Sequence, residues 1–159
     1  MRRRTLQLVP LVSLLLVSAC SAFDTDEWGE RREANERARA RWEALGATSY
    51  SFLYRESCFC ATAAYTPVAI TVRNGAIESV EMVGRDGEID PTALSLFPTI
   101  DQLFERVDAG IDERADRFDV DYHPRDGYPV KIVLDFRFNT ADDESTASVT
   151  DLELIEASL

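Results

Sequence analysis

The sequence predicts an α+β domain in which an antiparallel sheet of about six strands carries two helices packed on one face. Between residues 50 and 154, short segments alternate apolar and polar residues, which is typical of half-buried strands. Residues 25–46 and 99–111 instead carry helix-capping signals and helical spacing. Each helix precedes a run of three strands, so consecutive strands are expected to pair as antiparallel neighbours.

The two expected helices differ in how much apolar surface they offer. The first should run between Asp24, which stands three residues before Glu27 in a capping-box spacing, and Gly46, a typical C-cap. Its apolar stripe is thin and consists of Trp28, Ala38, Trp42 and Leu45. The second begins at Thr99, with Gln102 completing a capping box. Its stripe is continuous, and this helix is therefore expected to cover the core: Ile100, Leu103, Phe104, Val107 and Ile111.

The first three strands are expected around a hairpin. The first strand alternates at Tyr50, Phe52 and Tyr54, and the second covers residues 67–72. Asn74-Gly75 follows, a pair that suits a type I′ turn because both of its central positions need positive φ. The third strand begins at Ala76. Its apolar parity changes between Ile77 and Val80, which predicts a β-bulge near Glu78-Ser79. Residues 84–98 are expected to form a loop.

The second run of strands follows the second helix. Its first strand alternates at Phe118, Val120 and Tyr122 and ends in a turn over residues 124–127. The next strand alternates at five apolar positions: Val130, Ile132, Leu134, Phe136 and Phe138. Residues 139–148 are expected as an acidic loop before a final strand through Val149, Leu152 and Leu154.

The two halves of the chain, residues 25–84 and 99–156, match in order. Each reads helix, strand, strand, strand, and the apolar positions of the strands correspond, including a parity change in the third strand of each half. Such self-similarity predicts a duplicated αβββ unit.

The N-terminal residues predict export and lipid anchoring. Residues 1–19 read as a signal peptide, with three arginines at Arg2-Arg3-Arg4 before an apolar run of signal-peptide length. The run is too short for a permanent transmembrane helix, which needs roughly 20 apolar residues. Val17-Ser18-Ala19-Cys20 resembles a bacterial lipoprotein processing site. Cys20 is therefore expected to carry a diacylglycerol and an acyl chain such as palmitate, with residues 20–24 as a tether and 25–159 as one domain.

The net charge of this domain limits the kinds of partner that it can bind. The whole chain has 17 basic and 29 acidic residues. Removing the three leader arginines leaves 14 basic against 29 acidic residues, a net charge of −15. Such a surface repels phosphate backbones, so no nucleic-acid partner is expected. The expected partners are the membrane, through the lipid anchor, and an envelope protein or cell-wall component.

Cys58-Phe59-Cys60 is the most unusual motif of the domain. Lipidation consumes the thiol of Cys20, and the exported compartment is oxidising, so a disulfide between Cys58 and Cys60 is expected. In a regular strand these Cα atoms would lie roughly 6.5–7 Å apart, at the upper limit for a disulfide. The bond therefore predicts a bend that ends the first strand at about Ser57. A thiol-redox or metal-binding pair is the alternative.

Other candidate sites are weaker. His123 is the only histidine, and with Cys58 and Cys60 it gives three of the four ligands that a structural zinc site needs. Residues 86–90 begin like a calcium loop, but Pro91 stands where that loop needs glycine. The acidic cluster Asp142-Asp143-Glu144, with Asp135 near it, reads as solvated. One histidine and no G-x-S-x-G motif give no support for an enzyme, and no metal or cofactor is expected.

The order of motifs resembles an uncharacterised bacterial lipoprotein family, domain of unknown function 6174. The residues that carry the resemblance are Trp42, Tyr50-x-Phe52-x-Tyr54, Cys58-Phe59-Cys60, Val72-Arg73-Asn74-Gly75, Pro98-Thr99-Ile100-x-x-Leu103-Phe104, Tyr122, Gly127-Tyr128-Pro129, Ile132, Asp135 and Asp143-Glu144. The resemblance implies an envelope lipoprotein and no mechanism. At the level of fold alone, the chain is also similar to small envelope proteins of the PepSY and β-lactamase-inhibitor kind.

We therefore expect a non-enzymatic envelope lipoprotein, held by Cys20 in the inner leaflet of the outer membrane and facing the periplasm. Its domain would bind a partner through an exposed sheet face and acidic loops. Two alternatives stay open. One is an inhibitor of a periplasmic enzyme, which predicts an acidic, concave sheet that carries aromatic residues. The other is a thiol-redox protein that uses Cys58 and Cys60.

Overall fold

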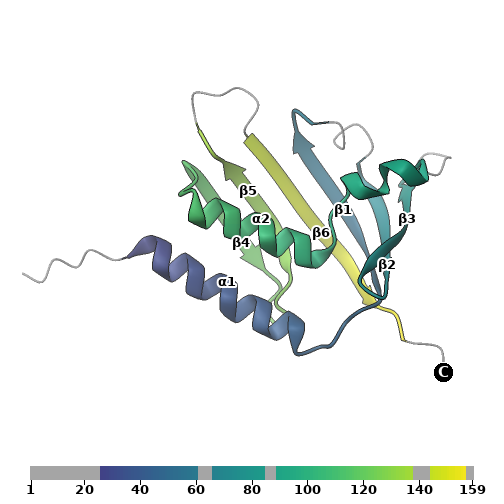
Figure 1. Ribbon diagram of the computed structural model, residues 1–159, viewed down its shortest axis with the longest axis horizontal. Helices are drawn as coiled ribbons and strands as arrows, with labels where there is room; N and C mark the ends of the chain where they lie inside the picture. The colour runs from purple at the N-terminus through teal and green to yellow at the C-terminus, as the bar shows by residue number, and fades with distance from the viewer. Residues whose placement is uncertain (1–25, 61–65, 85–88, 138–143, 157–159) are drawn as a thin grey trace, which may run out of the picture.

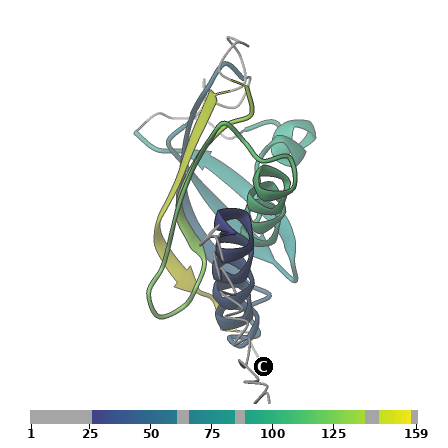
Figure 2. The same ribbon diagram turned by 90° about the vertical axis from the view of Figure 1, so that its left-hand side faces the viewer.

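The computed structural model describes residues 26–60, 66–84, 89–137 and 144–156 and confirms the predicted α+β fold. One antiparallel sheet of six strands has the order β3-β2-β1-β6-β5-β4. Both helices lie on the same face of it (Figure 1 and Figure 2). The elements are α1 (Glu27–Glu43), β1 (Tyr50–Cys58), β2 (Val68–Arg73), β3 (Ala76–Met82), the 3₁₀ helix η2 (Pro91–Leu96), α2 (Ile100–Asp112), β4 (Arg117–Tyr122), β5 (Pro129–Asp135) and β6 (Glu144–Leu154).

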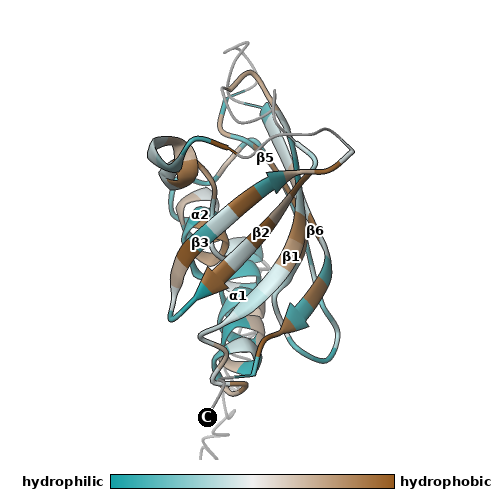
Figure 3. Ribbon diagram, turned by 90° about the vertical axis from the view of Figure 1, so that its right-hand side faces the viewer, coloured by the Kyte–Doolittle hydropathy of each residue, from teal (hydrophilic) through white to brown (hydrophobic). Residues whose placement is uncertain are grey.

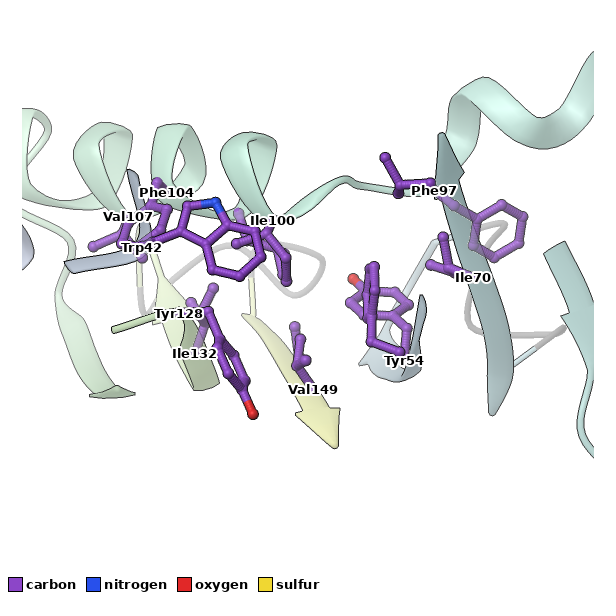
Figure 4. Packing of buried hydrophobic residues seen from close by; sticks show 14 of the residues in the cluster. Trp42, Tyr54, Ile70, Phe97, Ile100, Phe104, Val107, Tyr128, Ile132 and Val149 are labelled. Carbon is purple, nitrogen blue, oxygen red and sulfur yellow. The ribbon is translucent and has the colours of Figure 1, made fainter. Parts of the chain in front are cut away.

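The core lies between the sheet and α2 (Figure 4). The capping box of Thr99 and Gln102 is present, and the predicted apolar stripe of α2 is fully buried. Tyr50 of β1 reaches across, and its hydroxyl accepts a hydrogen bond from the backbone N–H of Ile100 at 3.1 Å. Trp42 of α1 packs edge-on against Tyr50 with ring centroids 5.1 Å apart. Tyr50 therefore joins α1 to the sheet through a ring contact and α2 through a hydrogen bond.

Buried polar contacts also hold α1 against the rest of the domain. Asn35 is 1% exposed; its amide donates to Asp108 of α2 at 2.6 Å and accepts from the hydroxyl of Tyr122 at 2.8 Å. Arg39 donates to the other oxygen of Asp108, also at 2.6 Å. Every polar group of this cluster that is buried thus has a partner, as a stable interior requires. The cluster ties α1 to α2 and to β4.

Several predicted boundaries were wrong. The side chain of Asp26, not Asp24, caps α1 by accepting from Gly29 N, and a 3₁₀ helix interrupts the loop predicted at 84–98. Strand β5 ends at Asp135, so Phe136 lies beyond it, and Phe138 lies outside the described residues. Strand β6 begins at Glu144, five residues before the predicted start, because Ala147 and Val149 are buried in the sheet.

Both predicted parity changes are β-bulges. In β3, Ser79 pairs with Thr71 while Ile77 pairs with Val72, which leaves Glu78 as the extra residue. In β6 the irregularity falls against β1, and Asp151 there adopts a φ of 51°. The Asn74-Gly75 turn is confirmed as well, with φ values of 49° and 79°.

The topology does not support a duplicated unit. Each half forms a three-stranded meander, and both meanders advance across the sheet in the same direction. Three antiparallel steps separate β1 from β4, so these two strands run in opposite directions (Figure 1). A rotation that superposed the halves would exchange the two faces of the sheet. Since both helices lie on one face, no rotation relates the halves, and the sequence match reflects two similar meanders.

The other face of the sheet has no helix over it among the described residues (Figure 3). Most of its residues are polar, and they form cross-strand rows: Ser79-Thr71-Ser51-Glu153, Glu81-Ala69-Leu53-Thr150, Arg55-Ser148-Lys131-Asp121 and Ser57-Thr146-Val133-Asp119. We call this surface the open face. No helix among the described residues is long and apolar enough to cross a membrane.

Candidate functional site

The candidate site lies at the end of β1, where the strand passes beyond the core. The even-numbered residues of β1 face the helices, and Tyr50, Phe52 and Tyr54 are buried there. Glu56 and Cys58 continue the same row into a region that α2 covers only partly. The alternation that builds the core thus also sets the positions of these two side chains.

Cys58 and Cys60 are brought to disulfide-bonding distance. Their Cα atoms are 5.2 Å apart, shorter than the roughly 6.5–7 Å between alternate residues of a regular strand and within the range of protein disulfides. The predicted bend is therefore present, although β1 continues to Cys58, one residue further than expected. Phe59 between them is 86% exposed.

Glu56 is fixed on two sides. Its side chain is only 9% exposed, and its carboxylate accepts from the guanidinium of Arg106 on α2 at 2.8 Å. Its backbone carbonyl accepts from the hydroxyl of Thr66 at 2.9 Å; Thr66 is the sixth residue after Cys60 in the sequence. A partly buried ion pair of this kind orients the carboxylate more firmly than a surface pair would.

A group of three potential metal ligands results. One carboxylate oxygen of Glu56 and the sulfurs of Cys58 and Cys60 all lie within 4.8 Å of one another. Sequence reasoning missed Glu56 because an acidic residue in an acidic chain gives no signal of its own. The period-2 spacing of Glu56 and Cys58 was the available signal, since it puts both side chains on one face.

Tyr54 lies next to this group. Its hydroxyl is buried and has no hydrogen-bond partner among the described residues. Burial raises the pKa of this hydroxyl, and the negative charge of Glu56 raises it further. A buried hydroxyl without a partner is uncommon in a native structure, so this position is chemically distinct from the rest of the core.

His123 lies away from the cysteines. It follows β4, and because β1 and β4 run in opposite directions, it is at the other end of the sheet from Cys58. Its Nδ1 accepts from the backbone N–H of Asp126 at 3.1 Å, and its ring stacks on Tyr128 with centroids 4.8 Å apart. His123 thus organises the β4–β5 turn, and the zinc set built on it does not assemble.

The remaining predicted residues have structural contacts or lie outside the described chain. Asp90 caps η2, accepting from the backbone and hydroxyl of Thr92. Glu144 pairs with Arg117 at 2.8 Å, and Asp135 accepts from the backbone of Arg137 at 3.0 Å. Three sets lie outside the described residues: Cys20, Asp86 to Glu88, and Asp142-Asp143.

A comparison with protein families identifies the family of this chain. The model of a family of unknown function, DUF6174, matches residues 34–154. The chain belongs to DUF6174. The DUF6174 region runs from within α1 to the end of β6, so it includes the whole sheet and the Glu56, Cys58 and Cys60 group. No curated protein and no solved structure matches the chain.

The structure explains one motif of this DUF6174 chain directly. Gly127 of the Gly127-Tyr128-Pro129 segment has a φ of 86°, a conformation that strongly favours glycine. A Cβ at this position would overlap the carbonyl oxygen of Ala38 in α1 and come within 2.9 Å of the Cβ of Arg41. Glycine therefore allows the β4–β5 turn to pack directly against the backbone of α1.

Proposed function

We propose that this DUF6174 chain is a cell-envelope lipoprotein, anchored through Cys20, whose domain binds a partner without catalysis. The observation that carries the anchor is Val17-Ser18-Ala19-Cys20, at the end of an apolar run that follows three arginines. Two or more lipid chains on Cys20 would hold the protein stably at a membrane. The proposed address is the inner leaflet of the outer membrane, with the domain in the periplasm.

The tether would keep the domain close to the membrane. The chain from Cys20 to Glu27, the first residue of α1, spans at most about 25 Å when fully extended. Under this proposal the N-terminal end of α1 faces the lipid. The opposite end of α1, with the Asn74-Gly75 turn and the β4–β5 turn, points away from it (Figure 1).

The open face is the proposed binding surface. Its rows carry hydroxyl and charged groups on adjacent strands, including Arg55, Ser148 and Lys131 side by side. A partner would be recognised there through hydrogen bonds and charge pairs. Every aromatic residue of the described chain except Phe59 lies in the helix-side core or packs against it. The inhibitor alternative predicts aromatic residues on the sheet surface, so the binding proposal is favoured over it.

The anchor is tested by replacing Cys20. The Cys20→Ser variant should lose incorporation of labelled palmitate and move from the membrane fraction to the soluble periplasmic fraction. Cys60→Ser is the matched control, since it removes a thiol from the same chain and should leave both results unchanged. Retention of Cys20→Ser in the membrane fraction, with no label, would show that another segment holds the protein there.

The binding surface is tested by photo-crosslinking in intact cells. A photoreactive residue at Thr71 or Ser148, on the open face, should give a discrete crosslinked product. The same residue at Arg37, which is exposed on α1, should not. Equal crosslinking at all three positions, or none at the first two, would remove the open face as the binding surface.

One observation supports the alternative function, a thiol-redox protein: the exposure of the cysteine pair. Phe59 and Cys60 are both exposed, so an external thiol could reach the proposed Cys58–Cys60 disulfide. Mass spectrometry of the untreated protein, followed by measurement of the reduction potential, tests it. A potential below that of envelope dithiols would exclude a redox role and leave the disulfide as a local link.

A further inference from the structure

We propose that Glu56, Cys58 and Cys60 bind a zinc ion when the two cysteines are reduced. The site is independent of the lipid anchor and goes beyond partner binding on the open face. In this view the end of β1 has two states, a disulfide and a zinc thiolate. The proposal rests on the cluster of ligand atoms and on the carboxylate that Arg106 holds in place.

The distances allow one ion to contact all three groups. Zinc binds sulfur at about 2.3 Å and carboxylate oxygen at about 2.0–2.2 Å, so ligands in a tetrahedral site lie roughly 3.5–3.8 Å apart. The three ligand atoms of the cluster are already within 4.8 Å of one another. After reduction, rotation of the exposed Cys60 side chain moves its sulfur away from that of Cys58 without moving the strand.

The donor set selects the class of metal. Two thiolates exclude Mg²⁺ and Ca²⁺, which take oxygen ligands. A carboxylate as third ligand favours Zn²⁺ over Cu⁺, which prefers an all-sulfur set. Three protein ligands leave one tetrahedral position for solvent, which suits a site at the edge of the core.

The surroundings of the cluster suit an ion there. Two thiolates and a carboxylate give zinc a net charge of −1, which the guanidinium of Arg106 balances through its contact with Glu56 at 2.8 Å. The same contact holds the ligating carboxylate in place, as outer hydrogen bonds do in known zinc sites. The buried hydroxyl of Tyr54, which has no partner among the described residues, is available to donate to the bound zinc's solvent ligand.

The two states interconvert by thiol–disulfide exchange. An external dithiol reduces the Cys58–Cys60 disulfide and is itself oxidised to a disulfide, and both cysteines become thiols. Zinc then displaces the two thiol protons as it binds the sulfurs. In the reverse direction, an external disulfide oxidises the two thiolates and is reduced to a dithiol, and the metal is released.

The test uses the full-length protein in detergent, prepared oxidised or reduced, with the reductant removed before titration. Reduced protein should bind one equivalent of Zn²⁺ in competition with a chromophoric chelator. With Co²⁺ as the probe, it should show sulfur-to-cobalt charge-transfer absorption. Oxidised protein should show neither signal. Absence of stoichiometric binding by the reduced protein overturns the proposal.

Variants separate ligation from folding. Cys58→Ser and Cys60→Ser should each lower the sulfur-to-cobalt absorption to at most that of one thiolate, and the double variant should lose it. A signal that survives in the double variant would refute the assignment. Glu56→Gln should weaken zinc binding at least about tenfold. Arg106→Gln breaks the same ion pair but keeps the ligand, so it should weaken binding less. Glu105→Gln, on an exposed position of α2, is the control and should bind as the wild type does. Equal affinities of Glu56→Gln and Glu105→Gln would exclude Glu56 as a ligand.

Discussion

Replacing Gly127 with alanine tests how the β4–β5 turn packs against α1. The φ of Gly127 is 86°, and placing a residue with a Cβ in the left-handed region costs about 1–2 kcal/mol. The new methyl group would also overlap the carbonyl oxygen of Ala38, a helix backbone atom that no side-chain rotation can move away. Such overpacking costs about 1–3 kcal/mol more. The expected loss in free energy of unfolding is therefore about 2–5 kcal/mol.

Gly84 provides the matched control for this substitution. Its φ of 75° is similar, but a Cβ there would meet no atom within 4 Å. Gly84→Ala should therefore lose only the backbone cost, about 1–2 kcal/mol. Urea unfolding of both variants, followed by circular dichroism and extrapolated linearly to zero denaturant, measures the difference. Equal losses in the two variants would show that the turn does not press on α1 as the structure indicates.

Three further predictions concern single side chains. Tyr122→Phe removes the donor to the buried Asn35 and should lower the free energy of unfolding by about 1–2 kcal/mol. Tyr54→Phe removes a hydroxyl that has no hydrogen-bond partner among the described residues, and it should cost nothing or stabilise the protein. Equal losses of the two variants in urea unfolding would contradict this prediction. Burial raises the pKa of Tyr50 to about 12, so its contribution to stability is complete below its ordinary pKa of about 10 and is lost as the pH rises through about 12. Tyrosinate absorbance and stability measured from pH 9 to 12.5 check this, and ionisation of all tyrosines near pH 10 in the folded protein would refute it. Phe59→Ser should leave the unfolding midpoint unchanged within error because the ring is 86% exposed, and a clear loss would place Phe59 in the core.

Local patterns predicted the elements that local interactions determine. The turn at Asn74-Gly75, the capping box of Thr99 and the extra residue at Glu78 each depend on neighbours in sequence, and the structure contains all three. The capping residue of α1 was misplaced by two positions because Asp24 has Glu27 at capping-box spacing, whereas the residue three positions after the true cap, Asp26, is Gly29.

Features that depend on distant segments could not be read from the sequence. Asn35 is polar in a polar helix, and its burial follows only from its partners Asp108 and Tyr122, which lie in α2 and β4. The prediction of a duplicated unit finds no support for a related reason. Periodicity indicates which residues face the core, but not the direction in which a strand runs. Ala147 likewise offers little apolar signal, although it is 1% exposed within β6.

In the candidate site, too, the residues recognised from local spacing were predicted, and the residue that depends on a distant contact was missed. Cys58 and Cys60 were found from their spacing, and their approach to 5.2 Å agrees with the predicted bend. Glu56 was missed because an acidic residue gives no signal in an acidic chain, and its contact Arg106 lies fifty residues later. A zinc set sought among histidines led to His123, which the strand directions place at the far end of the sheet.

The position of β6 has a consequence for how the protein is made. The last strand lies in the middle of the sheet, between β1 and β5, and Leu154 pairs with Tyr50. A growing chain that lacks β6 therefore holds two incomplete sheets, β3-β2-β1 and β5-β4, each with an unpaired edge that invites aggregation. Pairing over such a separation is slow compared with local helix and hairpin formation. The sheet can therefore close only after β6 has been synthesised, which makes its insertion between β1 and β5 a late step of folding.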